Sequence, residues 1–196
     1  MNNLSSVVPI NIPRTNRRFI KWCAGKLFIM LGWRITGSFP NEKKLILAVA
    51  PHTSNWDFVI GVIVKLALDL KLNFLGKDAI FFWPFNIWLK AIGGIAIDRK
   101  SPHGVVGQMV DKFEQQESLV LALAPEGTRS KVTQWKTGFL HIANKASVPV
   151  LPIQIDYKAK QIIFYQARNI GADIEDELQG IKSIFSKDCA KNPHNF

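Results

Sequence analysis

The sequence predicts a single α/β domain with a mixed, mostly parallel central sheet flanked by helices. Two observations favour this class. Short apolar runs recur along the chain, each ended by turn or polar residues, at positions 45–50, 92–97, 119–124, 148–155 and 161–166. Helical patterns lie between these runs, at positions 57–70, 104–117 and 137–146. Such alternation indicates that the central strands are buried on both faces of the sheet.

The length and composition fit one folded domain. The chain has 196 residues, of which 47% are hydrophobic and 20% charged, and this excludes a disordered tail protein. Cys23 and Cys189 cannot build a disulfide framework, so we interpret both as free thiols in a reducing compartment. A bilayer-spanning helix needs about 20 apolar residues. The longest uncharged apolar window, 79–89, is interrupted by Pro84, and we expect neither a spanning helix nor a secretory signal.

The positive charge is concentrated at the start of the chain. The formal net charge is +10, and residues 1–44 supply eight basic residues against one acid, Glu42. From Phe19 to Trp33 the basic residues alternate with aromatic and aliphatic ones. We therefore expect residues 1–40 to form an amphipathic helical segment that faces anionic lipids, followed by a domain over 41–196. The alternative is a basic first helix that packs on the core. A nucleic-acid partner is not expected, because no polar recognition face accompanies the charge.

Polar clusters follow three of the five apolar runs. They lie at 51–57, 98–100 and 125–130. Because chemistry collects at the carboxyl ends of parallel strands, we expect these loops to meet in one cleft. The remaining stretch, 171–196, has an acidic start and is predicted to be a surface helix and tail.

His52 and Asp57 form an H-x4-D pair at the point where the first polar loop leads into a helix. An Asp near a helix N-terminus is held by exposed N–H groups, and it can then accept from one imidazole nitrogen. The other nitrogen is left free to act as a base. The alternative is that Asp57 is a helix cap and His52 an ordinary loop histidine.

The third cluster offers groups suited to an anionic ligand. Gly127 allows close backbone approach, and Arg129 has the planar fork that fits phosphate, with Arg99 as a possible second cation. The alternative is a turn with a structural pair between Glu126 and Arg129. The sequence has no G-x-S-x-G elbow, Walker A loop or histidine spacing typical of a metal site, so no metal is expected.

Taken together, the chain resembles the lysophospholipid acyltransferase family, whose best-known members are the 1-acylglycerol-3-phosphate acyltransferases. Four blocks match in order, at 52–57, 94–99, 125–130 and 148–153, and Lys136 fits the pattern just after the third block. The resemblance implies transfer of a fatty acyl group from acyl-CoA or acyl carrier protein to a glycerol-type hydroxyl, with 1-acylglycerol-3-phosphate as the first candidate. It implies no cofactor.

The resemblance also implies roles for particular residues. His52 would act as the base and Asp57 would orient it, while the fourth block would be a buried supporting strand. The acceptor-binding positions would be Arg99, Glu126, Gly127, Thr128, Arg129 and Lys136. The spacing after Ser130 is shorter than in phosphatidate-forming members, which leaves another lysophospholipid or a lyso-ornithine lipid open as acceptor. The expected location is the cytoplasmic face of the inner membrane, as a peripheral or monotopic protein. A non-catalytic lipid-binding or membrane-adaptor protein is the alternative.

Overall fold

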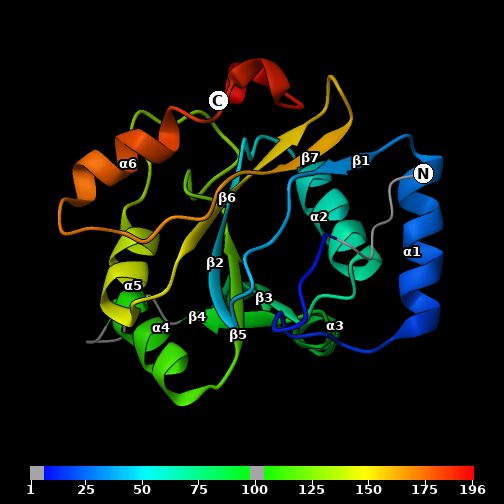
Figure 1. Ribbon diagram of the computed structural model, residues 1–196, viewed down its shortest axis with the longest axis horizontal. Helices are drawn as coiled ribbons and strands as arrows, with labels where there is room; N and C mark the ends of the chain where they lie inside the picture. The colour runs from blue at the N-terminus through cyan, green and yellow to red at the C-terminus, as the bar shows by residue number, and fades with distance from the viewer. Residues whose placement is uncertain (1–6, 98–103) are drawn as a thin grey trace.

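A computed structural model describes residues 7–97 and 104–196 of the chain (Figure 1). Its centre is a seven-stranded sheet with the order β1-β7-β6-β2-β5-β3-β4. The strands are β1 (Arg34–Thr36), β2 (Lys44–Ala50), β3 (Leu72–Lys77), β4 (Gly94–Ile97), β5 (Leu119–Leu123), β6 (Val150–Asp156) and β7 (Gln161–Phe164). Every neighbouring pair is parallel except β6 and β7. The predicted mixed, mostly parallel sheet is confirmed.

Helices cover both faces of this sheet, as predicted. They are α1 (Arg18–Met30), α2 (Asn55–Ala67), α3 (Phe85–Ala91), α4 (Gly104–Gln115), α5 (Gly138–Ala146) and α6 (Ile174–Lys182). In Figure 1, α1 and α2 lie on one side of the sheet, and α4 and α5 lie on the other. Short 3-10 helices at Lys187–Cys189 and Pro193–Asn195 end the chain.

Each predicted apolar run contains a strand, and the three predicted helices are present with small shifts at their ends. The central strands β2, β5 and β6 are largely buried, as expected for strands covered on both faces. Strands β1 and β3 and helix α3 were not predicted from the sequence. Their sequences are short or mix polar and apolar residues, so they carry no clear period of two or 3.6.

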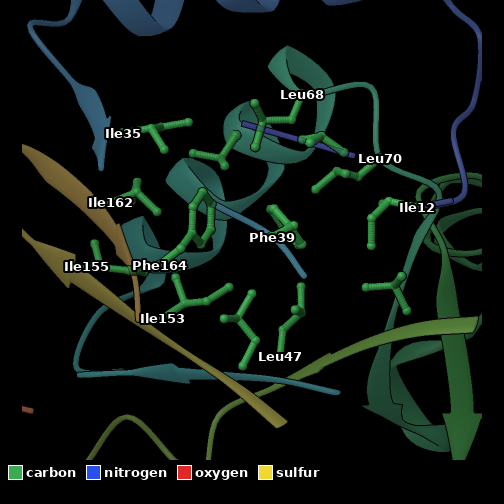
Figure 2. Close-up of a cluster of buried hydrophobic side chains, with 14 of the residues drawn as sticks. Ile12, Ile35, Phe39, Leu47, Leu68, Leu70, Ile153, Ile155, Ile162 and Phe164 are labelled. Atoms are coloured by element: carbon green, nitrogen blue, oxygen red, sulfur yellow. The ribbon is translucent and has the colours of Figure 1, made fainter. Parts of the chain in front are cut away.

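Two hydrophobic clusters form the core, one on each face of the sheet. The first cluster joins β2, β6 and β7 to α2 and to the residues before β2. Figure 2 shows part of this first cluster, where Ile153 of β6 and Phe164 of β7 lie on the side of Phe39, and the Phe39 and Phe164 rings are in contact. The second cluster joins α4, α5 and α6 to the other face of β2 and β5. The predicted surface helix α6 therefore buries one side, including Ile181, in the second cluster.

The N-terminal residues pack into the first cluster rather than forming a separate unit. Val8, Ile12 and Ile35 are buried there, and β1 completes one edge of the sheet. Residues on both sides of the predicted boundary at 40 and 41 thus share one core. The start of α1 is fixed by the buried Asp69 carboxylate, which accepts hydrogen bonds from the Thr15 hydroxyl and from the backbone N–H groups just before the helix.

Helix α1 buries only a narrow strip against the rest of the protein. Its buried residues are Ala24, Gly25 and Phe28. Its outward side carries exposed apolar side chains: Phe19, Ile20, Trp22, Leu27, Ile29 and Met30. A helix, α1, is therefore present within the predicted segment 1–40. One apolar side of it packs on the core, and another apolar side is exposed to solvent. Within the described residues, no helix is long and apolar enough to cross a bilayer.

The contrast between the two sides of α1 gives a stability prediction. Phe28 is fully buried, whereas Phe19 is 76% exposed on the same helix. We expect Phe28→Ala to lower the free energy of unfolding by about 3–5 kcal/mol and Phe19→Ala to change it by less than about 0.5 kcal/mol. Urea unfolding of both variants measures the difference, and equal effects would show that α1 is not docked as described.

Candidate active site

The candidate site lies at the carboxyl ends of β2 and β5. These strands are parallel neighbours, with Ala48 paired to Leu123, so the loops that follow them leave the sheet side by side. The first loop carries His52 and leads into α2, and the second begins at Ala124. Two of the three predicted polar clusters therefore meet. The cluster at 98–100, which includes Arg99, lies outside the described residues.

Asp57 is the centre of the hydrogen-bond network at this site. It is 3% exposed and occupies the first turn of α2, where Ser54 is the N-cap. Its Oδ2 accepts from the backbone N–H groups of Thr53 at 2.7 Å and Ser54 at 2.8 Å. Its Oδ1 accepts from the Tyr157 hydroxyl at 2.7 Å. One carboxylate thus caps the helix and shapes the loop before it.

The same carboxylate orients His52. The imidazole Nδ1 lies 3.3 Å from Asp57 Oδ2, and the His52 side chain is 19% exposed. Burial by itself raises the pKa of Asp57, but hydrogen bonds from His52, Tyr157 and the backbone outweigh it, so the pKa lies below its ordinary value. An ionised Asp57 holds the proton on Nδ1 and leaves Nε2 as an acceptor. Both sequence interpretations of Asp57, helix cap and histidine partner, describe the same side chain.

Tyr157 is part of this network, although no sequence pattern predicted it. It follows β6, and its ring packs edge-on against Trp33 at a centroid distance of 5.2 Å. Burial is the main reason that the pKa of its hydroxyl is raised, and the bond to Asp57 adds to the shift. Tyr157 therefore donates to Asp57 as a neutral phenol. Its position directly after β6, the strand that contains most of the fourth block, is the one signal that could have drawn attention to it.

The C-terminal segment is bonded to the His52 loop. The backbone N–H of Asn192 donates to Thr53 Oγ1 at 3.2 Å, and its side-chain amide donates to the Thr53 carbonyl at 3.0 Å. Lys191 Nζ lies 5.3 Å from the centre of the Tyr157 ring. Asn195 adds a longer bond of 3.4 Å to the Thr53 carbonyl. The predicted tail is thus a part of the site rather than a free end.

Glu126 lies behind His52 rather than in the open part of the site. It is 3% exposed, and its Oε1 accepts from the His52 backbone N–H at 2.8 Å. Its Oε2 is buried and has no hydrogen-bond partner among residues 7–97 and 104–196. Burial raises the pKa of Glu126, and the bond from His52 opposes the shift. In this structure Glu126 fixes the backbone of the histidine loop, and its predicted contact with an acceptor stays a prediction.

The remaining predicted residues lie on the loop after β5. Gly127 has a φ of +70°, which favours glycine, and a Cβ there would lie 3.2 Å from Lys136 Cγ. The Lys136 N–H donates to the Pro125 carbonyl at 2.8 Å and closes the loop. Thr128 and Arg129 are exposed on this loop. Arg129 and Lys136, like Lys131 between them, are therefore cations that this loop presents to solvent.

A large cavity joins these groups. Its volume is about 960 Å³, and its polar end is lined by His52, Asp57, Gly127, Thr128, Arg129 and Lys136. The rest of its wall is mostly apolar and belongs largely to the first core cluster, including Leu47, Ile153 and Phe164. A cavity of this size and lining suits a ligand with a long apolar part and one charged end. A base, a cationic rim and an apolar space are thus combined in one place.

Three comparisons with known proteins agree with one another. A family model described as Acyltransferase matches residues 34–156. A probable 1-acyl-sn-glycerol-3-phosphate acyltransferase of Mycoplasma pneumoniae is 35% identical over 124 residues, which is 58% of this chain and 45% of that protein. The 1-acyl-sn-glycerol-3-phosphate acyltransferase of Escherichia coli is 26% identical over 157 residues, 74% of this chain and 62% of that protein. The chain thus spans about half of the length of such relatives.

The fold has a solved counterpart. The crystal structure of the 1-acyl-sn-glycerophosphate (LPA) acyltransferase PlsC from Thermotoga maritima superposes with a TM-score of 0.59 at 20% sequence identity. The match covers 85% of this chain and 78% of that one. At this identity, the similarity establishes a shared fold.

The Tyr157 hydroxyl gives a prediction about the ionisation of Asp57. Tyr157→Phe removes a donor to Oδ1, so the pKa of Asp57 should rise toward its ordinary value of 3.8. A lowered native pKa stabilises the fold above the unfolded pKa, and the gain is lost as the pH falls. We expect Tyr157→Phe to lower the free energy of unfolding by about 1.5–3 kcal/mol at pH 7. The difference from the wild type should become smaller in acid, where Asp57 is protonated.

Carbon-13 NMR titration of the Asp57 carboxyl and urea unfolding at pH 7 and pH 3 test this expectation. Tyr165→Phe is the matched control, because the Tyr165 hydroxyl donates to Gln154 and not to Asp57. An Asp57 titration that is the same in both variants would contradict the assigned network.

Proposed function

The chain belongs to the acyltransferase family, and on this premise we propose that it transfers a fatty acyl group from a thioester to the hydroxyl of a lysolipid. The observation that carries the proposal is the oriented pair of His52 and Asp57, 3.3 Å apart, at the polar end of an apolar cavity. The thioester would come from acyl-CoA or acyl carrier protein. The reaction needs no cofactor.

In the proposed reaction, His52 Nε2 takes the proton of the acceptor hydroxyl as its oxygen attacks the thioester carbonyl. The new C–O bond forms, the C–S bond breaks, and the protonated imidazole returns the proton to the leaving thiolate. Asp57 keeps Nδ1 protonated throughout and stabilises the positive charge that develops on the ring. No acyl-enzyme is required, because the base and both substrates meet at one point.

The cavity supports a place for each part of the substrates. Its apolar wall, which includes Leu47, Ile153 and Phe164, suits a fatty chain. Arg129 and Lys136 at the polar end suit the phosphate of an acceptor or the negative charges of a donor. We therefore propose 1-acylglycerol-3-phosphate as the acceptor, the substrate that the names of the relatives give for those proteins.

Helix α1 supports a membrane partner for the protein. Its exposed apolar side chains, such as Phe19, Trp22 and Met30, are accompanied by basic residues and by no acid between Arg18 and Met30. Such a helix suits the headgroup region of an anionic bilayer. We propose that the protein works as a peripheral or monotopic protein at the cytoplasmic face of the inner membrane, where both lysolipid and product reside.

The role of His52 is tested by His52→Ala in an assay of thiol release from palmitoyl-CoA and palmitoyl-carrier protein, with lysophosphatidate as acceptor. The variant keeps the backbone N–H that Glu126 binds, so it should fold normally. We expect turnover to fall by about 10²- to 10⁴-fold. His141→Ala, an exposed histidine on α5, is the matched control. Unchanged turnover in His52→Ala would contradict the proposed role of His52 as the base. A wild-type protein that binds lipid but shows no turnover would favour a non-catalytic lipid-binding protein.

The acceptor is tested by Arg129→Ala across a panel of lysolipids with the lipid product identified by mass. Arg129 should contact the acceptor phosphate, so we expect KM for lysophosphatidate to rise by about tenfold or more. KM for a phosphate-free lyso-ornithine lipid should stay the same. Lys145→Ala, an exposed cation on α5, is the control. An unchanged KM for every acceptor would make Arg129 a structural residue.

A further inference from the structure

A second apolar surface lies on residues 80–88, the segment that leads into and includes most of α3. Trp83 is 77% exposed and Ile87 is 63% exposed. The exposed large side chains of this segment are Ile80, Phe82, Trp83, Phe85, Ile87 and Trp88. Six such side chains within nine residues exceed the scattered apolar residues of an ordinary surface, and a continuous apolar patch marks an interaction site.

The segment is anchored to the sheet, so its exposed side chains are held in place. Phe81 turns inward, and its ring lies over Gly76 of β3 and Gly94 of β4, where added Cβ atoms would come within 2.8 Å and 3.0 Å of it. Leu89 is buried at the other end of the segment. The turn after α3 is held by Lys65 of α2, whose Nζ donates to the Ile92 carbonyl. The outward direction of the patch is therefore built into the fold.

The chemistry of the patch fits a lipid surface. Between residues 79 and 91 the sequence has one charged side chain, Lys90, which is positive and exposed. Trp83 and Trp88 have apolar rings with a polar N–H, and such side chains are typical of the boundary between headgroups and acyl chains. Phe82 and Phe85 pack edge-on at 5.1 Å and extend the apolar area. An aromatic surface that is nearly free of charge suits the boundary between headgroups and acyl chains of a bilayer.

The patch also borders the cavity of the candidate site. Ile80 of this segment lines the cavity wall, and so do Leu89 and Ile92, which follow the segment in the chain. We propose that residues 80–88 form a lipid-contacting surface, separate from α1, which rests on the bilayer and brings the apolar wall of the cavity next to acyl chains. The exposed apolar side chains support the contact with lipid. The further step, that this contact brings acyl chains to the cavity, rests on the proposed function.

Tryptophan quenching locates the contact. The full chain is mixed with phosphatidylcholine–phosphatidylglycerol vesicles whose acyl chains carry bromine, and its emission is compared with that of the double variant Trp83→Phe, Trp88→Phe and of Trp22→Phe. Phenylalanine keeps the surface apolar, so binding should persist in all three proteins. We expect the double variant to lose a large part of the quenching beyond the part that Trp22→Phe loses. Quenching that disappears entirely with Trp22→Phe would overturn the proposal.

Vesicle sedimentation measures the strength of the contact. Trp83→Glu with Ile87→Glu should weaken binding by about tenfold or more per side chain, since each change removes a large apolar group from lipid. Gln115→Glu with Gln116→Glu adds the same charge at exposed positions at and just after the end of α4 and is the matched control. Equal binding by both variants would overturn the proposal. A second result would also overturn the proposal. If the wild type is a dimer, and Trp83→Glu with Ile87→Glu makes it a monomer that binds vesicles as well as the wild type does, the patch is a dimer interface.

Thiol release in detergent micelles separates this proposal from the proposed function. The double variant Trp83→Glu, Ile87→Glu has no change at the polar end of the cavity, so its turnover in micelles should equal that of the wild type. Weak vesicle binding with normal micellar turnover supports the surface. Absence of turnover in the wild type would count against the proposed function and would leave the vesicle results as a test of the patch.

Discussion

The ionised carboxylate of Asp57 is the group on which the site depends. It is nearly fully buried, and burial of an unpaired charge would cost several kcal/mol. Two backbone N–H groups, the Tyr157 hydroxyl and the His52 ring offset this cost. Because the donors come from the loop before α2 and from the residue that follows β6, the charge can be buried only when these parts are folded against α2. His52 is oriented because its ring is one of the groups that stabilise the buried Asp57 carboxylate.

The sheet supplies the second constraint. A parallel arrangement of β2 and β5 brings their loops to one end, and the apolar side chains of β6 and β7 continue the core to the wall of the cavity. Much of the cavity wall therefore consists of residues of the first core cluster, part of which Figure 2 shows. The same residues thus stabilise the domain by packing and determine the space that is available to an apolar ligand.

The sequence was sufficient for the parts that depend on local pattern. Buried strands such as β2 and β6 are continuous apolar runs, and the polar groups after β2 and β5 follow from chain order in a parallel sheet. The parts that could not be predicted depend on distant contacts. Tyr157 lies 100 residues from Asp57, and no spacing rule connects them. Glu126 was expected to face a ligand, yet whether a carboxylate turns to the cavity or to the backbone of His52 is decided by packing.

The bonds between Thr53 and Asn192 join residues separated by 139 positions. A chain emerging from the ribosome can form β2, α2 and β5 long before residue 192 has been made, but it cannot complete the support of the histidine loop. Domains of this kind close their most distant contacts late, because loop closure must precede any gain from them. The order of synthesis thus delays the complete support of the His52 loop until residue 192 has left the exit tunnel.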